Sequence, residues 1–439
     1  MTRALEHKIS TAAGAARRWG WRSLLAIVDQ GLISGANFVL VILFARWLSP
    51  PEYGAVSVAL SVFLLVANVH HAVVLEPMSV LGPRHFPDRL PRYFRTVLRA
   101  HLAAVTALAL ALVGASLLEV RSTPYLTRAL AGLALSTPMV LTFWLLRRLC
   151  YVNSDPRTAL RGGGAFLTSA LLGAFLVRDQ GWQSPASLFL ITAAAALCAA
   201  AVLTGATGLR RGGSQAPPAP SLRETLQAHW TYGRWMLGVS LTYWLANSAL
   251  PVLLALSAGL AGSAELRAVE NLVTPILQAT GALSLLLLPW VSGQTQALGP
   301  AYLRRFHLHG MLAAVSITGG YLVPVVLLRG HLMEWIYGPG AYTALAGLVP
   351  VVALATMVRG ISDLSLSTAL KGAARPEAHF YATVGSSAFV LTGGWWLIRH
   401  FGVTGAALTM LASNLTQAAV LALFYLRLTR RLGAPHAAD

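Results

Sequence analysis

Charged residues are scarce in this chain of 439 residues. Only 11% of them are Asp, Glu, Lys or Arg, whereas 56% are hydrophobic. Soluble domains carry about 25% charged residues, and a water-soluble fold of this length needs many more polar side chains to cover its surface. The composition therefore excludes an ordinary soluble domain and indicates that lipid is the solvent for most of the chain.

Acidic residues and cysteines are scarcer still. The 15 acidic residues stand against 33 Lys and Arg, so the net charge is +18. A nucleic-acid surface needs basic residues clustered on one face. Here they form short clusters between apolar runs, which is the pattern of cytoplasmic loops, so we expect no nucleic-acid partner. The two cysteines, Cys150 and Cys198, lie at or within apolar segments, which favours buried thiols; we expect no disulfide, metal site or cofactor.

Long apolar runs, by contrast, are abundant. A spanning helix needs about 20 mostly apolar residues, and only helices satisfy their own backbone groups in hydrocarbon. This criterion predicts an all-α polytopic membrane protein with twelve transmembrane helices. Their expected ranges are 24–46, 53–75, 98–118, 125–148, 157–177, 184–208, 233–256, 268–291, 308–328, 342–366, 379–399 and 402–426.

Basic residues are divided unequally between the two sides of this arrangement. With both termini and every second loop on one side, 25 of the 33 Lys and Arg fall there. Cytoplasmic loops carry the excess of positive charge. We therefore expect a multi-pass protein of a bacterial cytoplasmic (inner) membrane with both termini in the cytoplasm. Residues 1–23 show no cleavable signal pattern, so the first helix is expected to insert uncleaved.

A stretch rich in Gly, Pro and Ser divides the helices into two sets of six. Such composition is typical of a flexible linker. The expected order is a cytoplasmic segment 1–23, a six-helix lobe 24–208, a cytoplasmic linker 209–232, a second six-helix lobe 233–426 and a cytoplasmic tail 427–439.

The two sets of helices resemble each other in sequence. A shift of 210 residues places Asn37 on Asn247, and a shift of 221 places Gly181 on Gly402. Small loop insertions would produce such a slowly growing shift. The pattern predicts a parallel internal repeat, which is typical of transporters whose substrate site lies between the two halves.

Polar residues form stripes on four of the expected helices: the first, second, seventh and eighth. Polar groups in hydrocarbon are costly, so their placement is a functional signal, and residues spaced i, i+4, i+7 share one helix face. We therefore expect a water-filled cavity lined by these helices, with two further residues from the tenth. The predicted cavity-lining residues are Asp29, Gln30, Ser34, Asn37, Ser61, Asn68, His71, Tyr243, Asn247, Asn271, Gln278, Arg359 and Asp363.

Alternative roles stay open for several of these residues. Ser, Asn and Gln also form hydrogen bonds between packed helices. Arg359 and Asp363 lie four residues apart, so a structural ion pair and a role in substrate binding or coupling are both open. Asp29 is an ionisable group inside the first helix, for which we expect a functional role. Glu76 ends the second helix and is expected at the membrane interface.

The end of the first helix and the start of the second carry a recognisable motif. The run Ala45-Arg46-Trp47-Leu48-Ser49-Pro50-Pro51-Glu52-Tyr53-Gly54 resembles the A-R-x-L-x-P-x-E-Y-G pattern of Wzx-type polysaccharide-biosynthesis (O-antigen) flippases. These belong to the multidrug/oligosaccharidyl-lipid/polysaccharide (MOP) exporter superfamily. Leu75-Glu76-Pro77-Met78 resembles one branch of the family, and the twelve-helix, two-lobe pattern (MATE/MOP-like) extends the resemblance over nearly the whole chain.

The resemblance implies a flippase that moves an undecaprenyl-diphosphate-linked oligosaccharide across the membrane by alternating access, for surface polysaccharide assembly. It implies membrane lipids and the polysaccharide assembly machinery as partners, and leaves open coupling to an H⁺ or Na⁺ gradient. Arg46 and Glu52 are expected at a gate or interface. The sequence departs in one respect from what a diphosphate cargo requires, because few arginines lie in the middle of the expected helices. Arg359 is the main one, and the residue that binds the diphosphate is not identified.

Two other functions remain as alternatives. A drug or small-molecule exporter of the same superfamily would share the fold and differ in cargo. A membrane glycan polymerase or ligase usually needs a sizeable outer loop with catalytic groups, whereas the longest expected outer loop is 329–341 and carries no catalytic constellation. We therefore expect no enzyme.

Overall fold

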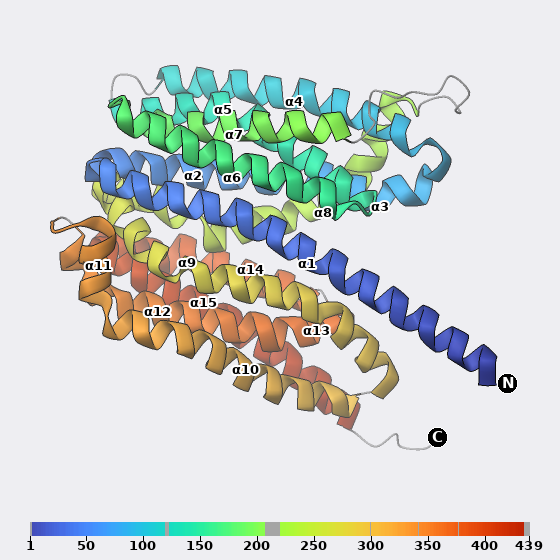
Figure 1. Ribbon diagram of the computed structural model, residues 1–439. Helices are drawn as coiled ribbons and strands as arrows, with labels where there is room; N and C mark the ends of the chain where they lie inside the picture. Colours follow the sequence, from blue (N-terminus) through green and yellow to red (C-terminus); the bar gives the residue numbers. More distant parts are fainter. Residues whose placement is uncertain are drawn as a thin grey trace. The chain divides into compact units, whose positions relative to one another are not determined.

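The computed structural model describes residues 2–118, 123–206, 220–298, 300–340, 342–375 and 377–433, and every element in these ranges is helical (Figure 1). The elements as far as the middle of the chain are α1 Thr2–Trp47, α2 Pro50–His70, the π-helix η1 His71–Leu75, α3 Glu76–His85, the 3-10 helix η2 Pro87–Arg89, α4 Leu90–Leu118, α5 Pro124–Val152, α6 Pro156–Asp179 and α7 Pro185–Ala206. They are followed by α8 Leu222–Asn247, α9 Leu250–Leu298, α10 Pro300–Leu327, α11 Arg329–Tyr337, the 3-10 helix η3 Thr343–Leu348, α12 Val349–Ile361, the π-helix η4 Ser362–Ser367, α13 Thr368–Gly372, α14 Glu377–Phe389, the π-helix η5 Val390–Gly394 and α15 Trp395–Gly433.

Ten helical stretches of the described residues are long and apolar enough to cross a membrane. Two of them, Leu222–Leu288 and Glu377–Arg430, contain 67 and 54 residues, whereas one crossing needs about 20. Each contains a glycine at positive φ, Gly259 (φ 77°) and Gly402 (φ 54°). Because the chain turns back at these glycines, each stretch supplies two crossings. The predicted all-α membrane fold with about twelve spanning helices is confirmed.

Side-chain contacts show the two reversals directly. Ser263 Oγ donates to the carbonyl oxygen of Pro251 at 2.5 Å, although the residues are 12 apart in the chain, whereas 12 residues of straight helix span about 18 Å. Thr409 Oγ1 likewise donates to the carbonyl oxygen of Gly394 at 3.2 Å. Only glycine adopts the left-handed backbone of such turns without strain from a Cβ atom.

The internal repeat is visible in these hairpins. Gly181 (φ 71°) turns the chain between α6 and α7, just as Gly402 does between the two helices of α15. The sequence shift of 221 residues aligns these two glycines. Equivalent positions of the two halves thus each carry a glycine at positive φ where one helix turns into the next.

Several helices extend beyond their predicted ends, among them α1, α5 and α8. α1 begins at Thr2 instead of residue 24, α5 ends at Val152 instead of 148, and α8 begins at Leu222 instead of 233. The sequence criterion ended each helix at its basic residues because it counted apolar ones, but arginine is itself a good helix former with a long apolar stem. Residues 209–219 of the predicted linker lie outside the described residues.

Contacts divide the chain into two compact units. The first unit comprises Met1–Phe44 and Val69–Leu237, and the second comprises Ala45–Asn68 and Gly238–Asp439. The chain therefore changes unit within the helices α1, α2 and α8, whereas the sequence analysis placed its lobe boundary in the linker.

Within the first unit, α5 packs against α4 and α7, and α6 packs against α7 (Figure 1). Gly132 of α5 permits close approach, since a Cβ there would lie 2.9 Å from the backbone of Ala186. Asp155 caps α6 by accepting hydrogen bonds from the backbone N–H and the hydroxyl of Thr158. These hydrogen bonds hold the pKa of Asp155 below its ordinary value.

Within the second unit, α15 packs against α9, α12 and α14. Gly360 of α12 lies against Thr318 of α10, where a Cβ would come within 2.8 Å of the threonine methyl. The π-helix η4 follows α12 directly and carries Asp363. Single π-helical turns inside helices often accompany functional sites, which makes this segment a candidate part of the substrate site.

Candidate substrate site

An ion pair in the first unit joins α1 to α5. Asp29 is fully buried, and its Oδ2 accepts hydrogen bonds from Arg147 Nε at 2.7 Å and from the Tyr151 hydroxyl. Arg147 Nη2 also donates to Gln30 Oε1 at 3.0 Å, and Gln30 Nε2 donates to Ser34 Oγ at 3.0 Å. Three predicted site residues of α1 are therefore linked to one arginine that the prediction did not include.

The two side chains of this ion pair differ in their exposed fraction. The side chain of Arg147 is 18% exposed, whereas that of Asp29 is 0% exposed. Gly163 of α6 faces the carboxylate, and a Cβ at this glycine would overlap Asp29 Oδ1. That second carboxylate oxygen is buried and has no hydrogen-bond partner among the described residues. The pair thus presents its cation outward and encloses its anion.

The next residue of α5, Arg148, belongs to a second charged group in the same unit. Its Nη2 lies 3.1 Å from His71 Nε2, and His71 Nδ1 lies 3.7 Å from Glu76 Oε2. The hydroxyl of Tyr232 donates to Glu76 Oε1 at 3.2 Å. His71 opens the π-helix η1, so the predicted residues His71 and Glu76 lie on either side of a widened helical turn.

In the second unit, Arg359 connects two other predicted residues. Its Nε lies 3.6 Å from Asp363 Oδ2, and its Nη2 donates to the Tyr243 hydroxyl at 2.8 Å. A further ion pair joins Arg267 Nη1 and Glu270 Oε2 at 3.2 Å. Each of these carboxylates therefore has an arginine partner, as expected for charges placed within a membrane.

Asn271 lies in the interior of the second unit, at 3% exposure. Its Nδ2 donates to the hydroxyls of Tyr53 at 2.9 Å and Tyr337 at 3.2 Å. Tyr337 donates in turn to the carbonyl oxygen of Ala268 at 2.8 Å. Burial raises the pKa of Tyr337, so its hydroxyl remains a donor. This network joins α2, α9 and α11.

Three more predicted residues form hydrogen bonds close to their own positions in the chain. Ser61 Oγ donates to the carbonyl oxygen of Ser57, and Asn247 Nδ2 donates to that of Tyr243. Glu52 Oε2 accepts from the backbone N–H and the hydroxyl of Ser49, which fixes the start of α2. The remaining predicted residues are the exposed Asn37, Arg46 and Gln278 and the half-buried Asn68.

The sequence analysis missed Arg147, Arg148 and Tyr151 because its fourth helix ended at residue 148, and the two arginines at that end were counted with the basic residues of the cytoplasmic side. A signal was present: the run Leu145-Leu146-Arg147-Arg148-Leu149-Cys150-Tyr151-Val152 is apolar on both sides of the arginines. Two adjacent charges inside an apolar run indicate a charged site within a helix.

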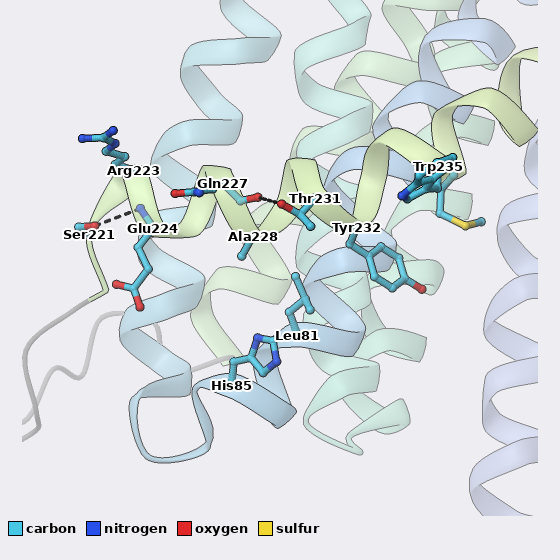
Figure 2. A pocket seen from close by; sticks show the side chains of 11 residues that line it. Leu81, His85, Ser221, Arg223, Glu224, Gln227, Ala228, Thr231, Tyr232 and Trp235 are labelled. Atoms are coloured by element: carbon cyan, nitrogen blue, oxygen red, sulfur yellow. Dashed lines mark hydrogen bonds between the residues drawn. The ribbon is translucent and has the colours of Figure 1, made fainter.

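A groove of about 850 Å³ opens on the first unit between α3 and the start of α8 (Figure 2). Leu81 and His85 of α3 line it on one side, and side chains of α8 such as Glu224, Tyr232 and Trp235 line it on the other. Ser221 lies just before α8, and its Oγ accepts a hydrogen bond from the backbone N–H of Glu224 at 3.1 Å. None of the predicted site residues lines this groove. Among the described residues, no three His, Cys, Asp or Glu gather into a candidate metal site.

Comparisons with known proteins identify the fold. No known family model matches the chain, and no curated protein matches its sequence. Solved structures do match. An inward-facing multidrug resistance MATE family transporter of the MOP superfamily superposes with a TM-score of 0.72 at 13% identity, over 94% of this chain and 100% of its own.

Two further structures match to a similar extent. The lipid II flippase MurJ, in an inward closed conformation, gives a TM-score of 0.70 at 13% identity, over 92% of this chain and 87% of its own. A MOP superfamily transporter from Pyrococcus furiosus, described as having a binding pocket of reverse polarity, superposes with a TM-score of 0.63 at 13% identity. The match covers 94% of this chain and 95% of that transporter. The chain therefore has the same fold as these MATE and MOP superfamily transporters and as the lipid II flippase MurJ.

Proposed function

We propose that this protein is a MOP-type transporter that moves an undecaprenyl-diphosphate-linked oligosaccharide across a bacterial cytoplasmic membrane by alternating access. The fold, the motif from Ala45 to Gly54 and the apolar helices support this proposal. Both termini are taken to be cytoplasmic because the basic residues concentrate on that side. The proposal involves no enzymatic step.

One observation supports an anionic cargo: the ion pair of α1 and α5 exposes its arginine and encloses its aspartate. An anionic head group can reach Arg147, at 18% exposure, whereas a cationic drug cannot reach Asp29, at 0%. Arg148 lies next to it in the chain. Guanidinium groups bind phosphate oxygens through charge-assisted, often bidentate hydrogen bonds. In this proposal, Arg147 and Arg148 would bind the diphosphate, for which the sequence analysis identified no ligand.

Reconstituted transport tests this proposal. Liposomes that contain the protein and a fluorescent undecaprenyl-diphosphate oligosaccharide should move the label from one leaflet to the other. Replacing both Arg147 and Arg148 with Gln should reduce the rate at least tenfold, because removing buried charge-assisted bonds costs several kcal/mol. Arg128→Gln is the matched control: it is an exposed arginine of the same helix, roughly 28 Å away along the axis.

The rival function has a different readout in the same vesicles. A drug exporter of this fold would move a cationic dye such as ethidium and leave the lipid-linked oligosaccharide in place. Dye transport without flipping of the oligosaccharide would refute the proposal in favour of that alternative.

A further inference from the structure

The groove between α3 and the start of α8 has the size of a ligand site, although none of the predicted site residues lines it. Its volume of about 850 Å³ lies within the range of about 300–1,000 Å³ that is usual for ligand pockets. Leu81 and His85 of α3 form one wall, and α8 forms the other (Figure 2). The Tyr232 hydroxyl donates to Glu76 Oε1 at 3.2 Å and so joins α8 to the first residue of α3. The groove is therefore a candidate site for a second ligand.

Packing on another face of α8 holds this wall in place. His229 Nδ1 lies 3.0 Å from the carbonyl oxygen of Val73, and His229 Nε2 lies 2.7 Å from the Tyr93 hydroxyl. Gly233 lies so close to the preceding helical segment that a Cβ would come within 2.9 Å of the Ala72 carbonyl oxygen. These contacts fix α8 through one face and leave the face that lines the groove uncovered.

The polarity of the lining changes along the groove. The charged residues Arg223 and Glu224 lie where α8 begins, whereas Trp235 and Met236 lie at the far end. Roughly 18 Å along the helix axis separates Glu224 from Met236. A phospholipid presents its groups in the same order, a charged head group followed by apolar chains.

The start of α8 lies at the membrane surface. α8 contains 26 residues and is about 39 Å long, whereas the hydrocarbon core of a bilayer is about 30 Å thick. Leu222, Leu226 and Trp230 recur every four residues and form an exposed apolar stripe on this part of the helix. Tryptophan is typical of the membrane interface. Lipid therefore surrounds the start of α8, and the charged end of the groove lies at the level of the head groups.

Arg223 and Glu224 bring opposite charges to this end of the groove. Neither side chain forms an ion pair or a hydrogen bond within the part of the chain that the structure describes. Consecutive residues of an α-helix point in directions about 100° apart, and Figure 2 shows these two side chains directed away from each other. A head group with both a phosphate and an ammonium group matches both charges, whereas a purely anionic head group would leave Glu224 beside an anion.

We propose that this groove binds one molecule of phosphatidylethanolamine from the surrounding membrane. Its phosphate binds the guanidinium of Arg223 through charge-assisted hydrogen bonds, and its primary ammonium donates to the carboxylate of Glu224. An acyl chain lies along Leu81, Ala228 and Trp235. Phosphatidylcholine carries no N–H donor and phosphatidylglycerol carries no cation, so neither lipid satisfies the carboxylate. Lipid binding at this groove does not depend on which cargo the protein transports.

Native mass spectrometry of the purified full chain tests this site. The protein is incubated in detergent with an equimolar mixture of phosphatidylethanolamine, phosphatidylcholine and phosphatidylglycerol that carry identical acyl chains. The wild type should retain one phosphatidylethanolamine per chain. Its occupancy should exceed that of either other lipid by about three- to tenfold, as expected for one charge-assisted hydrogen bond at a partly exposed site.

Two substitutions remove different parts of the recognition. Glu224→Gln keeps the size of the side chain and removes its charge, so the preference for phosphatidylethanolamine over phosphatidylcholine should disappear. Ala228→Phe fills the groove and leaves its charges in place, so the bound lipid should be lost. Glu334→Gln is the control, because Glu334 is exposed on α11 and forms no ion pair with other described residues; this variant should behave as the wild type.

Thermal unfolding shows whether Ala228→Phe is folded, and Glu224→Gln decides the question if it is not. A wild-type preference for phosphatidylglycerol, equal retention of the three lipids or an unchanged preference in Glu224→Gln would overturn the inference. Retention of one phosphatidylethanolamine by folded Ala228→Phe would also overturn it, because the lipid would then bind elsewhere. So would a dimer that Ala228→Phe disrupts, which would assign the groove to a second copy of the chain.

Discussion

Gly163 determines whether the carboxylate of Asp29 fits between α1 and α6. A Cβ at position 163 would overlap Asp29 Oδ1, while Arg147 and Tyr151 hold the other oxygen in place. We expect Gly163→Ala to displace the carboxylate, to destabilise the protein by about 1–3 kcal/mol as overpacking does, and to reduce transport. Thermal unfolding of the purified protein, followed by intrinsic fluorescence, measures the first effect.

The neighbouring residue Gly164 supplies the control, because a Cβ there meets nothing within 4 Å. Gly164→Ala should leave transport unchanged and raise stability slightly, by about 0.5–1 kcal/mol, since alanine is the better helix former. Equal effects of the two substitutions would show that the contact with Asp29 is unimportant.

At the level of residues, sequence reasoning located one side of each interaction. Asp29 and Gln30 were recognisable because polar groups inside an apolar helix are costly. Their partner Arg147 lies 118 residues away, and no local pattern specifies which helix packs against which. The same reason hides the bonds of Asn271 to Tyr53 and Tyr337, which are 218 and 66 residues distant in the chain.

The hairpin within α15 depends on close backbone contact after its turn. Gly402 has φ 54°, and a Cβ on Gly405 would overlap the carbonyl oxygen of Leu397 on the preceding helix. Backbone atoms cannot move aside as a side chain can. We expect Gly405→Ala to lower the midpoint of thermal unfolding by several degrees, because the hairpin must open.

Gly385 of α14 provides the comparison. A Cβ there would make only ordinary contacts, at 3.8 Å from the side chains of Thr416 and Val420. Gly385→Ala should therefore unfold at the wild-type temperature or above it. If Gly405→Ala unfolds at the same temperature as Gly385→Ala, the backbone contact of the hairpin does not limit stability.

At the level of elements, hydropathy located the helices but not their ends. The apolar criterion found the crossings because hydrocarbon requires long apolar helices. It ended the fourth expected helix at 148, whereas α5 ends at Val152. Arg147 therefore stood at the expected helix end and was counted with the basic residues of the cytoplasmic side, not with the polar residues of the site. The turns at Gly181 and Gly402 were aligned by the sequence repeat, but their left-handed backbone was visible only in the structure.

At the level of the whole molecule, composition was sufficient for the fold class and insufficient for the units. Charge content and apolar run length predicted an all-helical membrane protein, and the fold comparisons agree. The sequence boundary followed the linker, whereas Ala45–Asn68 belongs to the second unit by its contacts. This assignment depends on packing between helices that are distant in the chain, such as the close contact of Gly54 with the backbone of Leu260. No change in amino-acid composition along the chain indicates such a contact.

Access to water distinguishes a transport pathway from a lipid-facing surface, although the side chains of both are exposed on the isolated chain. Asn37, Gln278 and Ala194 are all exposed side chains of spanning helices. The polar stripes predict water beside Asn37 and Gln278 and lipid beside Ala194. We expect Asn37→Cys and Gln278→Cys to react with a water-soluble methanethiosulfonate and Ala194→Cys to remain inert, because the reactive thiolate does not form in hydrocarbon.

The background for this measurement must lack the native thiols Cys150 and Cys198, of which Cys198 is exposed. Labelling in nanodiscs gives both faces of the membrane access to the reagent, so sidedness does not affect the outcome. The reaction rates should differ by at least tenfold, as thiolate fractions do between water and an apolar environment. Similar rates at all three positions would mean that the polar stripes face lipid or protein, and the route of the cargo would then have to be sought away from α1 and α9.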